Sequence, residues 1–298
     1  MGKTGLSTKK TSIVPPTVQA PGVFHKRIGD ITLSILNDGE VSTSVLPLDG
    51  IGPAAISAVR GASEWITVNC IAVHSSGRLA LIDAGANKLR PTTGLLMRNM
   101  AVAGLVPEDF DTVLLTHMHP DHVGWLIDDD GKALFPSCKI VMANAEHAFW
   151  ADERNRSRVS RRDPPWHDQN IAVLNAYRGR IETFDAGEVF PGVSAIPLPG
   201  HTPGHTGYEI TSGPHSAVTW GDLVQNHTLQ LRFPAAEVSY DIDPPLAVKS
   251  RIDLFKRLAS EPRLLVAGHH LPFPSLFRLA EASVGYNLIA EPWSPHVR

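Results

Sequence analysis

The chain has 298 residues, of which 43% are hydrophobic and 19% are charged, a balance that excludes disorder and allows a large core. Its 27 basic and 30 acidic residues give a net charge of −3, so there is no positive surplus for recruiting nucleic acid. The composition therefore favours a globular protein that acts on small molecules.

The N-terminal residues 1–24 are expected to form a flexible arm, and residues 25–298 a single α/β domain. The arm is rich in Lys, Thr, Ser and Pro and has no apolar stretch of signal-peptide length, and no later segment is long and apolar enough to span a membrane. Cys70 and Cys138 lie in strand-like apolar runs, which is typical of buried free thiols. These features predict a cytoplasmic protein without a membrane partner.

In the first half of the chain, hydrophobic periodicity predicts strands and helices in alternation. A hairpin across the turn Ser75-Ser76-Gly77 ends in Asp83, and a basic cluster between 154 and 162 is interpreted as a solvated face. The predicted strands are 31–36, 65–73, 79–82, 112–116 and 139–143, and the predicted helices are 93–105, 145–153 and 168–177.

The second half repeats this pattern. A hairpin formed by 208–211 and 217–220 ends in Gly221-Asp222, and a helix at 244–259 and a strand at 263–267 follow. Two similar halves predict two packed sheets with helices outside them. We expect the functional site where the halves meet.

Four potential metal ligands occur within six positions directly after the buried strand at 112–116: His117, His119, Asp121 and His122. The first two histidines stand two residues apart, so an extended backbone points both to one side, and a turn at Pro120 can present the other two ligands to a neighbouring point. Several buried imidazoles with a carboxylate are costly unless a cation compensates, and zinc favours such donors. The segment therefore predicts metal binding.

The pattern His-x-His-x-Asp-His after a hydrophobic strand resembles the signature of the metallo-β-lactamase superfamily. Three later segments agree with it in order: Gly-His-Thr-Pro-Gly-His at 200–205, Gly-Asp at 221–222 and Gly-His-His at 268–270. The resemblance covers about residues 28–290. It implies a four-layer αββα sandwich with a dinuclear metal site at the edge of the two sheets.

The resemblance also implies the distribution of ligands. His117, His119 and His201 would bind one metal, and Asp121, His122 and His270 the other, with Asp222 bridging them. A carboxylate has two oxygens and can ligate two cations ~3.5–4 Å apart. We expect two divalent ions, with zinc foremost and iron, manganese and cobalt as alternatives.

The late histidine is ambiguous because His269 and His270 are adjacent. The segment His-Leu-Pro-Phe-Pro at 270–274 resembles the branch that contains methyl parathion hydrolase and related lactonases and arylesterases, where the histidine directly before this motif is the ligand. We therefore choose His270. His205 is expected to orient its loop or to meet Asp83, which can accept a hydrogen bond from a metal-binding imidazole.

A dinuclear site of this kind predicts a hydrolase in which a hydroxide shared by the metals attacks a neutral lactone or aryl ester, and also phosphotriesters. Asp121 and Asp222 are the predicted catalytic carboxylates, and Asp121 would relay a proton to the leaving group. Trp150 and Trp166 are candidates for an aromatic substrate pocket, with core packing as the equal alternative.

Three alternative functions stay open: an iron-dependent redox protein of the same fold, a β-lactamase-like amide hydrolase, and a non-catalytic binding protein. Acyl-homoserine lactonases of this superfamily carry a Tyr three residues after the bridging Asp, where this chain has Gln225, so that tyrosine's role does not transfer. The expected partner is a small-molecule substrate, and a homodimer is left open.

Overall fold

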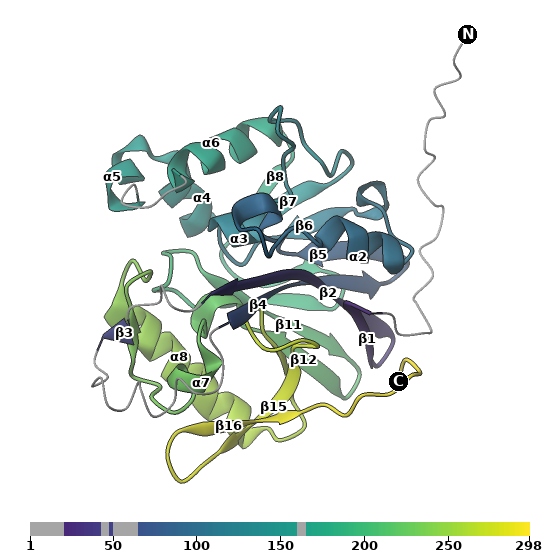
Figure 1. The fold of residues 1–298 in the computed structure, drawn as a ribbon, viewed down its shortest axis with the longest axis vertical. Helices are drawn as coiled ribbons and strands as arrows, with labels where there is room; N and C mark the ends of the chain where they lie inside the picture. The colour runs from purple at the N-terminus through teal and green to yellow at the C-terminus, as the bar shows by residue number, and fades with distance from the viewer. Residues whose placement is uncertain (1–20, 43–47, 50–64, 160–164) are drawn as a thin grey trace.

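The computed structural model describes residues 21–42, 48–49, 65–159 and 165–298, and the structural statements below concern these residues. Two seven-stranded sheets pack face to face, and helices cover the outer face of each (Figure 1). This arrangement confirms the predicted four-layer sandwich. The first sheet is built from the first half of the chain and the second sheet from the second half, as the repeated pattern predicts.

The first sheet is antiparallel from β1 to β5 and parallel from β5 to β8. In spatial order its strands are β1 (Val23–Ile28), β2 (Ile31–Ser42), β4 (Trp65–Ser75), β5 (Arg78–Ile82), β6 (Thr112–Leu114), β7 (Lys139–Ala143) and β8 (Ile181–Phe184).

The second sheet is antiparallel except for the parallel pair β12 and β14. In spatial order its strands are β16 (Tyr286–Ala290), β15 (Leu276–Glu281), β14 (Leu265–Ala267), β12 (His215–Thr219), β11 (Thr206–Ser212), β10 (Val193–Pro197) and β9 (Gly187–Phe190). A separate two-stranded pair joins β3 (Leu48–Asp49) to β13 (Glu237–Val238).

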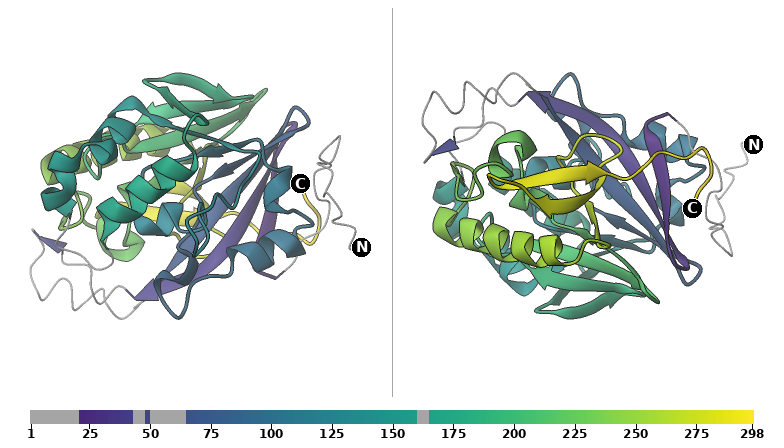
Figure 2. Two further views of the ribbon diagram at one scale, coloured as in Figure 1. Left: turned by 90° about the horizontal axis from the view of Figure 1, so that it is seen from above. Right: turned by 90° about the horizontal axis from the view of Figure 1, so that it is seen from below.

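The helices lie on the two outer sides of the sandwich, as the views from above and below show (Figure 2). Those over the first sheet are α2 (Leu96–Val102), α3 (Pro120–Val123), α4 (Asn144–Ala151), α5 (Arg156–Val159) and α6 (Trp166–Ala176). The second half contributes α7 (His227–Gln230) and the long α8 (Pro244–Ser260). Short 3-10 turns are η2 (Asn87–Leu89), η3 (Pro107–Asp109), η4 (Glu153–Asn155) and η5 (Gly221–Leu223).

Alternation along the strands divides the core into layers. In β4, Ile71 and Val73 pack between the two sheets, whereas Cys70 and Ala72 face the helices over the first sheet. A third layer lies between the second sheet and α8, where Phe255 is fully buried. Both sheets are therefore largely covered on both faces, and the candidate ligands lie beyond the strand ends.

The candidate ligands follow the carboxyl ends of two parallel strand pairs. In the first sheet β5 and β6 are parallel, and in the second sheet β12 and β14 are parallel. Parallel strands end at the same edge of a sheet, so the loops after these four strands converge at one edge of the sandwich. Those loops begin with Asp83, with the segment 116–122, with Gly221-Asp222 and with Gly268-His269-His270.

The structure confirms both predicted hairpins and the strand at 139–143. Three predictions need correction. The helix expected over 93–105 is limited to Leu96–Val102, with Gly94 before it and Gly104 after it in left-handed conformations that end it. Part of the expected arm belongs to the fold, because β1 starts at Val23; residues 1–20 lie outside the described residues. Strands β1, β3, β8, β9, β10, β13, β15 and β16 were not predicted.

Both cysteines are buried and free, as predicted. Within the described part of the chain, no helix has both the length and the apolar character needed to cross a membrane.

Candidate metal centre

The segment after β6 leads four side chains to the edge of the sandwich, as its spacing predicts. The imidazoles of His117 and His119 meet edge to face with centroids 4.5 Å apart, and that of His201, from the loop after β10, lies 4.7 Å from His117 and 4.6 Å from His119. All three are buried. With Asp222, they form a first group in which one ligand atom per residue lies within 4.8 Å of every other.

A second group lies next to the first and contains Asp121, His122, His269 and His270, again within 4.8 Å of one another. Asp121 and His122 lie on the short helix α3, whose first residue is Pro120, and the other two follow β14. The turn at Pro120 thus separates the two ligand sets, as predicted from the sequence.

The carboxylate of Asp222 lies between the groups. Its Oδ2 is 3.5 Å from His201 Nε2 and 3.3 Å from His270 Nε2, and its Oδ1 is 2.9 Å from His122 Nε2. One carboxylate therefore faces imidazoles of both groups, the geometry required of a ligand shared by two cations.

Hydrogen bonds orient two of these rings through Asp83 and Thr116. His122 Nδ1 donates to Asp83 Oδ2 at 2.8 Å, as expected for that carboxylate. His117 Nδ1 lies 3.1 Å from Thr116 Oγ1, and this hydroxyl donates to Asp83 Oδ2 at 2.8 Å, so it accepts from His117.

The other two rings are oriented by partners that the sequence did not indicate. His201 Nδ1 donates to Asp241 Oδ1 at 2.7 Å, and His270 Nδ1 donates to the Thr67 carbonyl at 2.9 Å. In each of these four rings, Nδ1 makes a hydrogen bond to a residue outside the two groups, and Nε2 faces the centre of the site. Asp241 follows β13 and is distant in sequence from every ligand motif. The group that Thr67 contributes is a backbone oxygen. Neither could therefore be recognised from the sequence.

The inward atoms fit a cation. Among the described residues, His117 Nε2 is buried without a hydrogen-bond partner, and His122 Nε2 and Asp222 Oδ1 face each other at 2.9 Å without a hydrogen bond between them. Buried polar atoms are nearly always paired, so several orphans facing one point mark a place for another group. Nitrogen and carboxylate donors of this kind suit zinc and similar divalent metals.

Electrostatics differ between the groups. In the first group, burial lowers the pKa of His117 and His119 well below the usual value, and neighbouring imidazoles lower it further. Both rings are therefore neutral, which is the form that binds a metal.

In the second group, burial again lowers the pKa of His122 and His270, but nearby carboxylates outweigh burial and raise it. The dominant carboxylate for both rings is Asp222. The pKa of Asp222 falls in turn: burial raises it, and the His270 and His122 rings outweigh that effect. The nearby carboxylates of Asp222 and Asp121 thus make the position of these two rings favourable for a positive charge.

The contacts of the two adjacent late histidines differ. The His269 ring stacks on His122 with centroids 3.8 Å apart, and its nearest carboxylate is Asp83, 3.9 Å from Nδ1. By contrast, His270 Nε2 lies 3.3 Å from both Asp121 Oδ2 and Asp222 Oδ2. His270 therefore faces the two carboxylates, whereas His269, whose ring nitrogens have no hydrogen-bond partner among the described residues, lies against the His122 ring; both belong to the second group.

His205 orients its loop and the Asp222 turn, and does not meet Asp83. Its Nδ1 donates to the Leu198 carbonyl at 2.9 Å, and its Nε2 accepts from the Asp222 N–H at 3.0 Å. Burial lowers the pKa of His205 to about 3, which keeps the ring neutral for this double role. A Cβ at Gly221 would lie 2.6 Å from His205 Nε2, so only glycine fits there.

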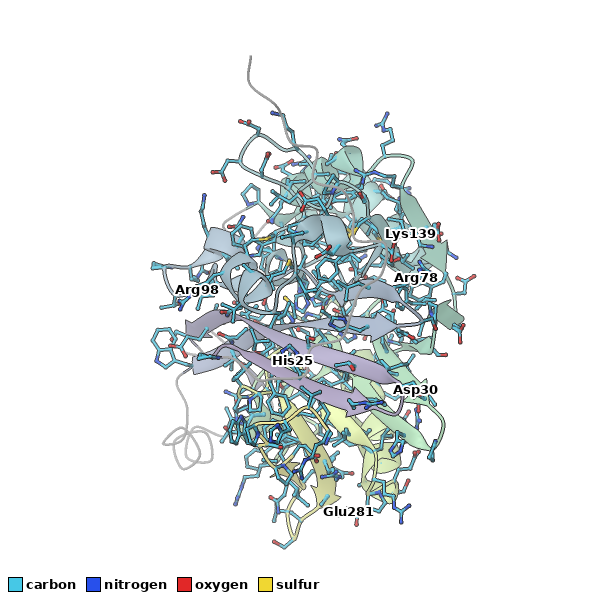
Figure 3. The ribbon with its side chains drawn as sticks, turned by 90° about the vertical axis from the view of Figure 1, so that its right-hand side faces the viewer. His25, Asp30, Arg78, Arg98, Lys139 and Glu281 are labelled. Carbon is cyan, nitrogen blue, oxygen red and sulfur yellow. The ribbon has the colours of Figure 1, made fainter. Side chains whose placement is uncertain are left out.

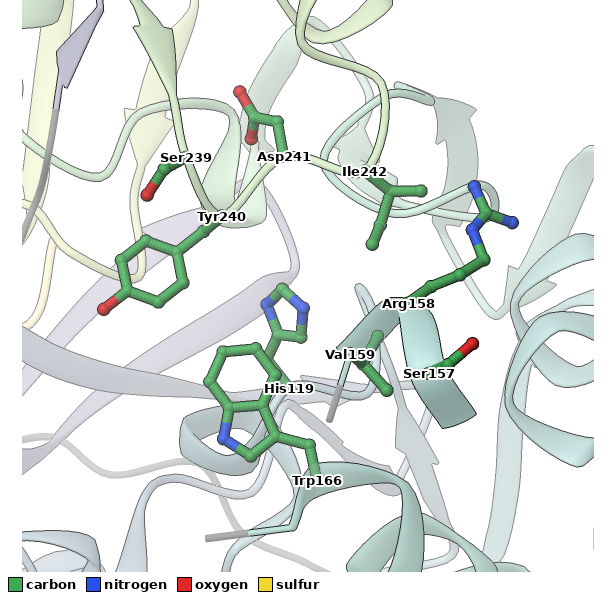
Figure 4. A pocket seen from close by; sticks show the side chains of 9 residues that line it. All are labelled: His119, Ser157, Arg158, Val159, Trp166, Ser239, Tyr240, Asp241 and Ile242. Carbon is green, nitrogen blue, oxygen red and sulfur yellow. The ribbon is translucent and has the colours of Figure 1, made fainter. Parts of the chain in front are cut away.

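A cavity of about 560 Å³ adjoins the first group, with Trp166 beside His119 (Figure 4). The centroid of Trp166 lies 4.6 Å from that of His119, and its ring is nearly parallel to Tyr240. Arg158, part of the cluster interpreted as solvated, also lines the cavity. The full lining is His119, Ser157, Arg158, Val159, Trp166, Ser239, Tyr240, Asp241 and Ile242.

The two tryptophans proposed for a substrate pocket have different surroundings. Trp166 lines the cavity, whereas Trp150 is fully buried in the core over the first sheet and is not among the lining residues. The indole N–H of Trp150 donates to Glu146 at 2.7 Å. The pocket role expected for Trp150 is therefore corrected to core packing.

Comparison with known proteins agrees with this geometry. The chain matches the family described as the Metallo-beta-lactamase superfamily over residues 64–269. The crystal structure of AbOPH, a hydrolase in the beta lactamase superfamily, is 30% identical, with a TM-score of 0.82 over 93% of this chain and 99% of its own. AidC, a dizinc quorum-quenching lactonase solved with a product, is 26% identical, with a TM-score of 0.82 over 92% of this chain and 98% of its own.

Among curated proteins, the uncharacterised YobT of Bacillus subtilis is 26% identical over 170 residues, which span 55% of this chain and 63% of that protein. The family match includes the His-rich segment, the Asp222 turn and the start of the late histidine pair, the same residues that meet at the sheet edge. The chain belongs to the metallo-β-lactamase superfamily and has the metal-dependent hydrolase fold of that superfamily.

Proposed function

We propose that the protein is a dinuclear zinc hydrolase that cleaves neutral lactones or aryl esters, with phosphotriesters as a weaker second class. The observation that carries the proposal is the position of Asp222 between two sets of inward-facing imidazoles, beside a cavity with an aromatic wall. A family likeness supports metal-dependent hydrolysis, and the cavity supports the substrate class.

One ion would be held by His117, His119 and His201. The other would be held by Asp121, His122 and His270, and Asp222 would bind both ions. When bound, the two cations supply a water made acidic enough to attack at neutral pH and a Lewis acid for the attacked oxygen. The protein's own part is orientation, because each Nδ1 hydrogen bond fixes a ring before any substrate arrives.

Asp121 would relay the proton of the attacking water to the leaving group. Its side chain keeps 19% of its surface exposed, compared with 5% for Asp222, so it is the more accessible of the two carboxylates. Burial raises its pKa, but the His122 and His270 imidazoles outweigh burial and lower it, so the carboxylate is ionised and can take up a proton at Oδ1 or Oδ2. That proton can then pass to the leaving group.

The cavity favours a neutral, apolar substrate. Trp166, Tyr240 and Ile242 offer aromatic and aliphatic surface for an acyl or aryl group. Its described lining contains one cation, Arg158, and one carboxylate, Asp241, so it has no cationic surplus for an anionic substrate. This supports lactones and aryl esters over phosphodiesters.

The descriptions of similar proteins also support a metal-dependent hydrolase. AidC is described as a dizinc lactonase and AbOPH as a hydrolase. We extend the first description to this chain as support for zinc and for lactone hydrolysis.

The test is a comparison of kcat/KM for four substrate classes on one zinc-loaded preparation: neutral lactones and aryl esters, phosphotriesters, β-lactams, and phosphodiesters. We expect the neutral lactones and esters to be cleaved best and phosphotriesters more slowly. A preference for β-lactams or phosphodiesters would overturn the proposed substrate class, and oxygen consumption by an iron-loaded protein without hydrolysis would replace it with redox chemistry.

We also propose a cytoplasmic location, with a small molecule as the substrate and a homodimer left open. Two buried free thiols suit a reducing compartment. Fractionation of cells that make the protein should recover it with cytoplasmic markers; recovery with membrane or secreted material would contradict this location.

A further inference from the structure

We propose that Glu146 is a positioning residue that sets the spacing of the three-histidine group by tying together the two loops that carry it. The inference rests on the proposed metal centre, although Glu146 itself contacts none of the proposed ligands. It assigns a role to a buried carboxylate that has no part in the proposed hydrolysis.

One oxygen of Glu146 holds the loop after β6. Glu146 lies in the first turn of α4 and is fully buried. Its Oε1 accepts the Met118 N–H at 2.9 Å, and Met118 stands between His117 and His119. The same oxygen accepts the Trp150 indole N–H at 2.7 Å, which anchors it to the core.

The other oxygen holds the loop that carries His201. Glu146 Oε2 accepts the Thr202 hydroxyl at 2.5 Å and the Gly204 N–H at 3.2 Å. A Cβ at Gly204 would lie 2.2 Å from the Glu146 nitrogen, so the loop lies directly against α4. Glycine permits this close approach.

Four donors therefore surround one carboxylate and fill its acceptor positions. Asn170 on α6 adds a further hold on the first loop, since its Nδ2 donates to the Met118 carbonyl at 2.7 Å. Asn170 holds only that loop, whereas Glu146 links both. Burial raises the pKa of the Glu146 carboxyl, and its four hydrogen bonds act in the opposite direction. Because these bonds lie in the buried interior and reach both loops, they are suited to fixing the distance between the loops.

The selectivity of the link makes it testable. The hydrogen bonds of Glu146 reach Met118, between His117 and His119, and the loop of His201; within the described part of the chain, none reaches the Asp222 turn or the loop of His270. Its loss should weaken the ion held by three histidines more than the ion held by Asp121, His122 and His270. Partners that orient metal ligands typically change metal affinity 10- to 100-fold when they are removed.

Glu146→Gln is the sharpest variant because it keeps the shape and replaces one acceptor oxygen with a donor that faces two donors. Glu153→Gln, at an exposed ion pair with Arg156 on the same side of the fold, is the matched control. Each protein is stripped of metal, and the affinities for two equivalents of Co²⁺ are measured by chelator competition and visible absorption. Thermal unfolding checks that each variant is folded.

We expect wild type and Glu153→Gln to bind both ions alike, and Glu146→Gln to bind one ion at least about tenfold more weakly with an altered Co²⁺ spectrum. Thr202→Val removes one of the four donors and should weaken the same ion by a smaller factor, which tests the link even if Glu146→Gln does not fold. Wild-type affinities and spectra in folded Glu146→Gln, or in Thr202→Val, would overturn the inference. Absence of lactone and ester hydrolysis by the two-metal protein would contradict the proposed function alone.

Discussion

Asp83 connects a ring in each metal group: its Oδ2 accepts from His122 Nδ1 at 2.8 Å and from the Thr116 hydroxyl that orients His117. Its Oδ1 accepts the Thr116 N–H at 2.8 Å. Asp83 has a left-handed backbone, with φ of 59°, at the end of β5. A strained conformation at such a position is retained where the side chain has a role, and here that role is orientation.

Asp83→Asn should reduce metal affinity about 10- to 100-fold without unfolding the protein. Asparagine tolerates the left-handed backbone, but its amide replaces one acceptor oxygen with a donor facing His122 or Thr116. Asp129→Asn, at an exposed ion pair with Lys88, is the control. Affinity measured by chelator competition should fall in the first variant only, and equal affinities would remove Asp83 from this role.

His270→Ala should lose metal and turnover, and His269→Ala should retain most of both. Only His270 directs Nε2 at Asp121 and Asp222, whereas His269 stacks on His122. Metal content by elemental analysis and kcat for an aryl ester separate the two variants. If His269→Ala is the one that loses metal, the assignment of the late ligand is off by one residue.

Trp166→Ala should raise KM for an aryl ester about tenfold and cost less stability than Trp150→Ala, because Trp166 lines the cavity and is only partly buried. Trp150→Ala should instead lower the free energy of unfolding by about 3–5 kcal/mol, because Trp150 is fully buried. Urea unfolding and steady-state kinetics on both variants check this contrast. A similar KM in wild type and Trp166→Ala would place the substrate elsewhere.

Acid should destabilise the protein through a buried pair of histidines in the first sheet. His25 on β1 (Figure 3) and His74 on β4 both contact the Ser34 hydroxyl, at 2.9 and 3.0 Å. Burial lowers the pKa of each from 6.5 to about 4. Between these values the unfolded chain binds protons that the folded protein does not, so stability is full above pH 6.5 and falls as the pH drops towards 4.

The loss is about 2 kcal/mol per histidine at pH 4.5. His74→Gln can still bond to Ser34 and does not titrate, so metal-free wild type should lose about 2 kcal/mol more than this variant between pH 7 and 4.5 in urea unfolding. Equal losses in the two proteins would show that His74 is not the group responsible.

The sequence predicted those ligands that share a local pattern. The segment 117–122 follows a buried strand, so its spacing alone indicates one metal set beside another. Glu146 and Asp241 orient this segment and His201 from positions with no such pattern, because a carboxylate that reaches a loop from a distant element leaves no periodic trace. The orientation of the His270 ring likewise depends on the Thr67 carbonyl, which only the tertiary fold supplies.

Several strands were predicted where most side chains are buried, and others were missed where most are at least partly exposed. Residues 65–82 form a hairpin with buried flanks and a polar turn, and the pattern is clear. In β8, β9 and β16 most side chains are at least partly exposed, so the sequence there looks like loop. These strands lie at or next to sheet edges, where neighbours on one side are lacking and selection for apolar residues is weak.

The shared role of Asp222 is tested most directly by titrating metal-free protein with Zn²⁺ while kcat for an aryl ester is measured in wild type and Asp222→Ala. In wild type, activity should rise until two equivalents are bound. Asp222→Ala leaves two cations without their common anion, so it should retain at most one tightly bound ion, and kcat should fall at least about a thousandfold. Wild-type activity that saturates at one equivalent, or near-normal turnover in Asp222→Ala, would contradict a dinuclear hydrolase built around this carboxylate.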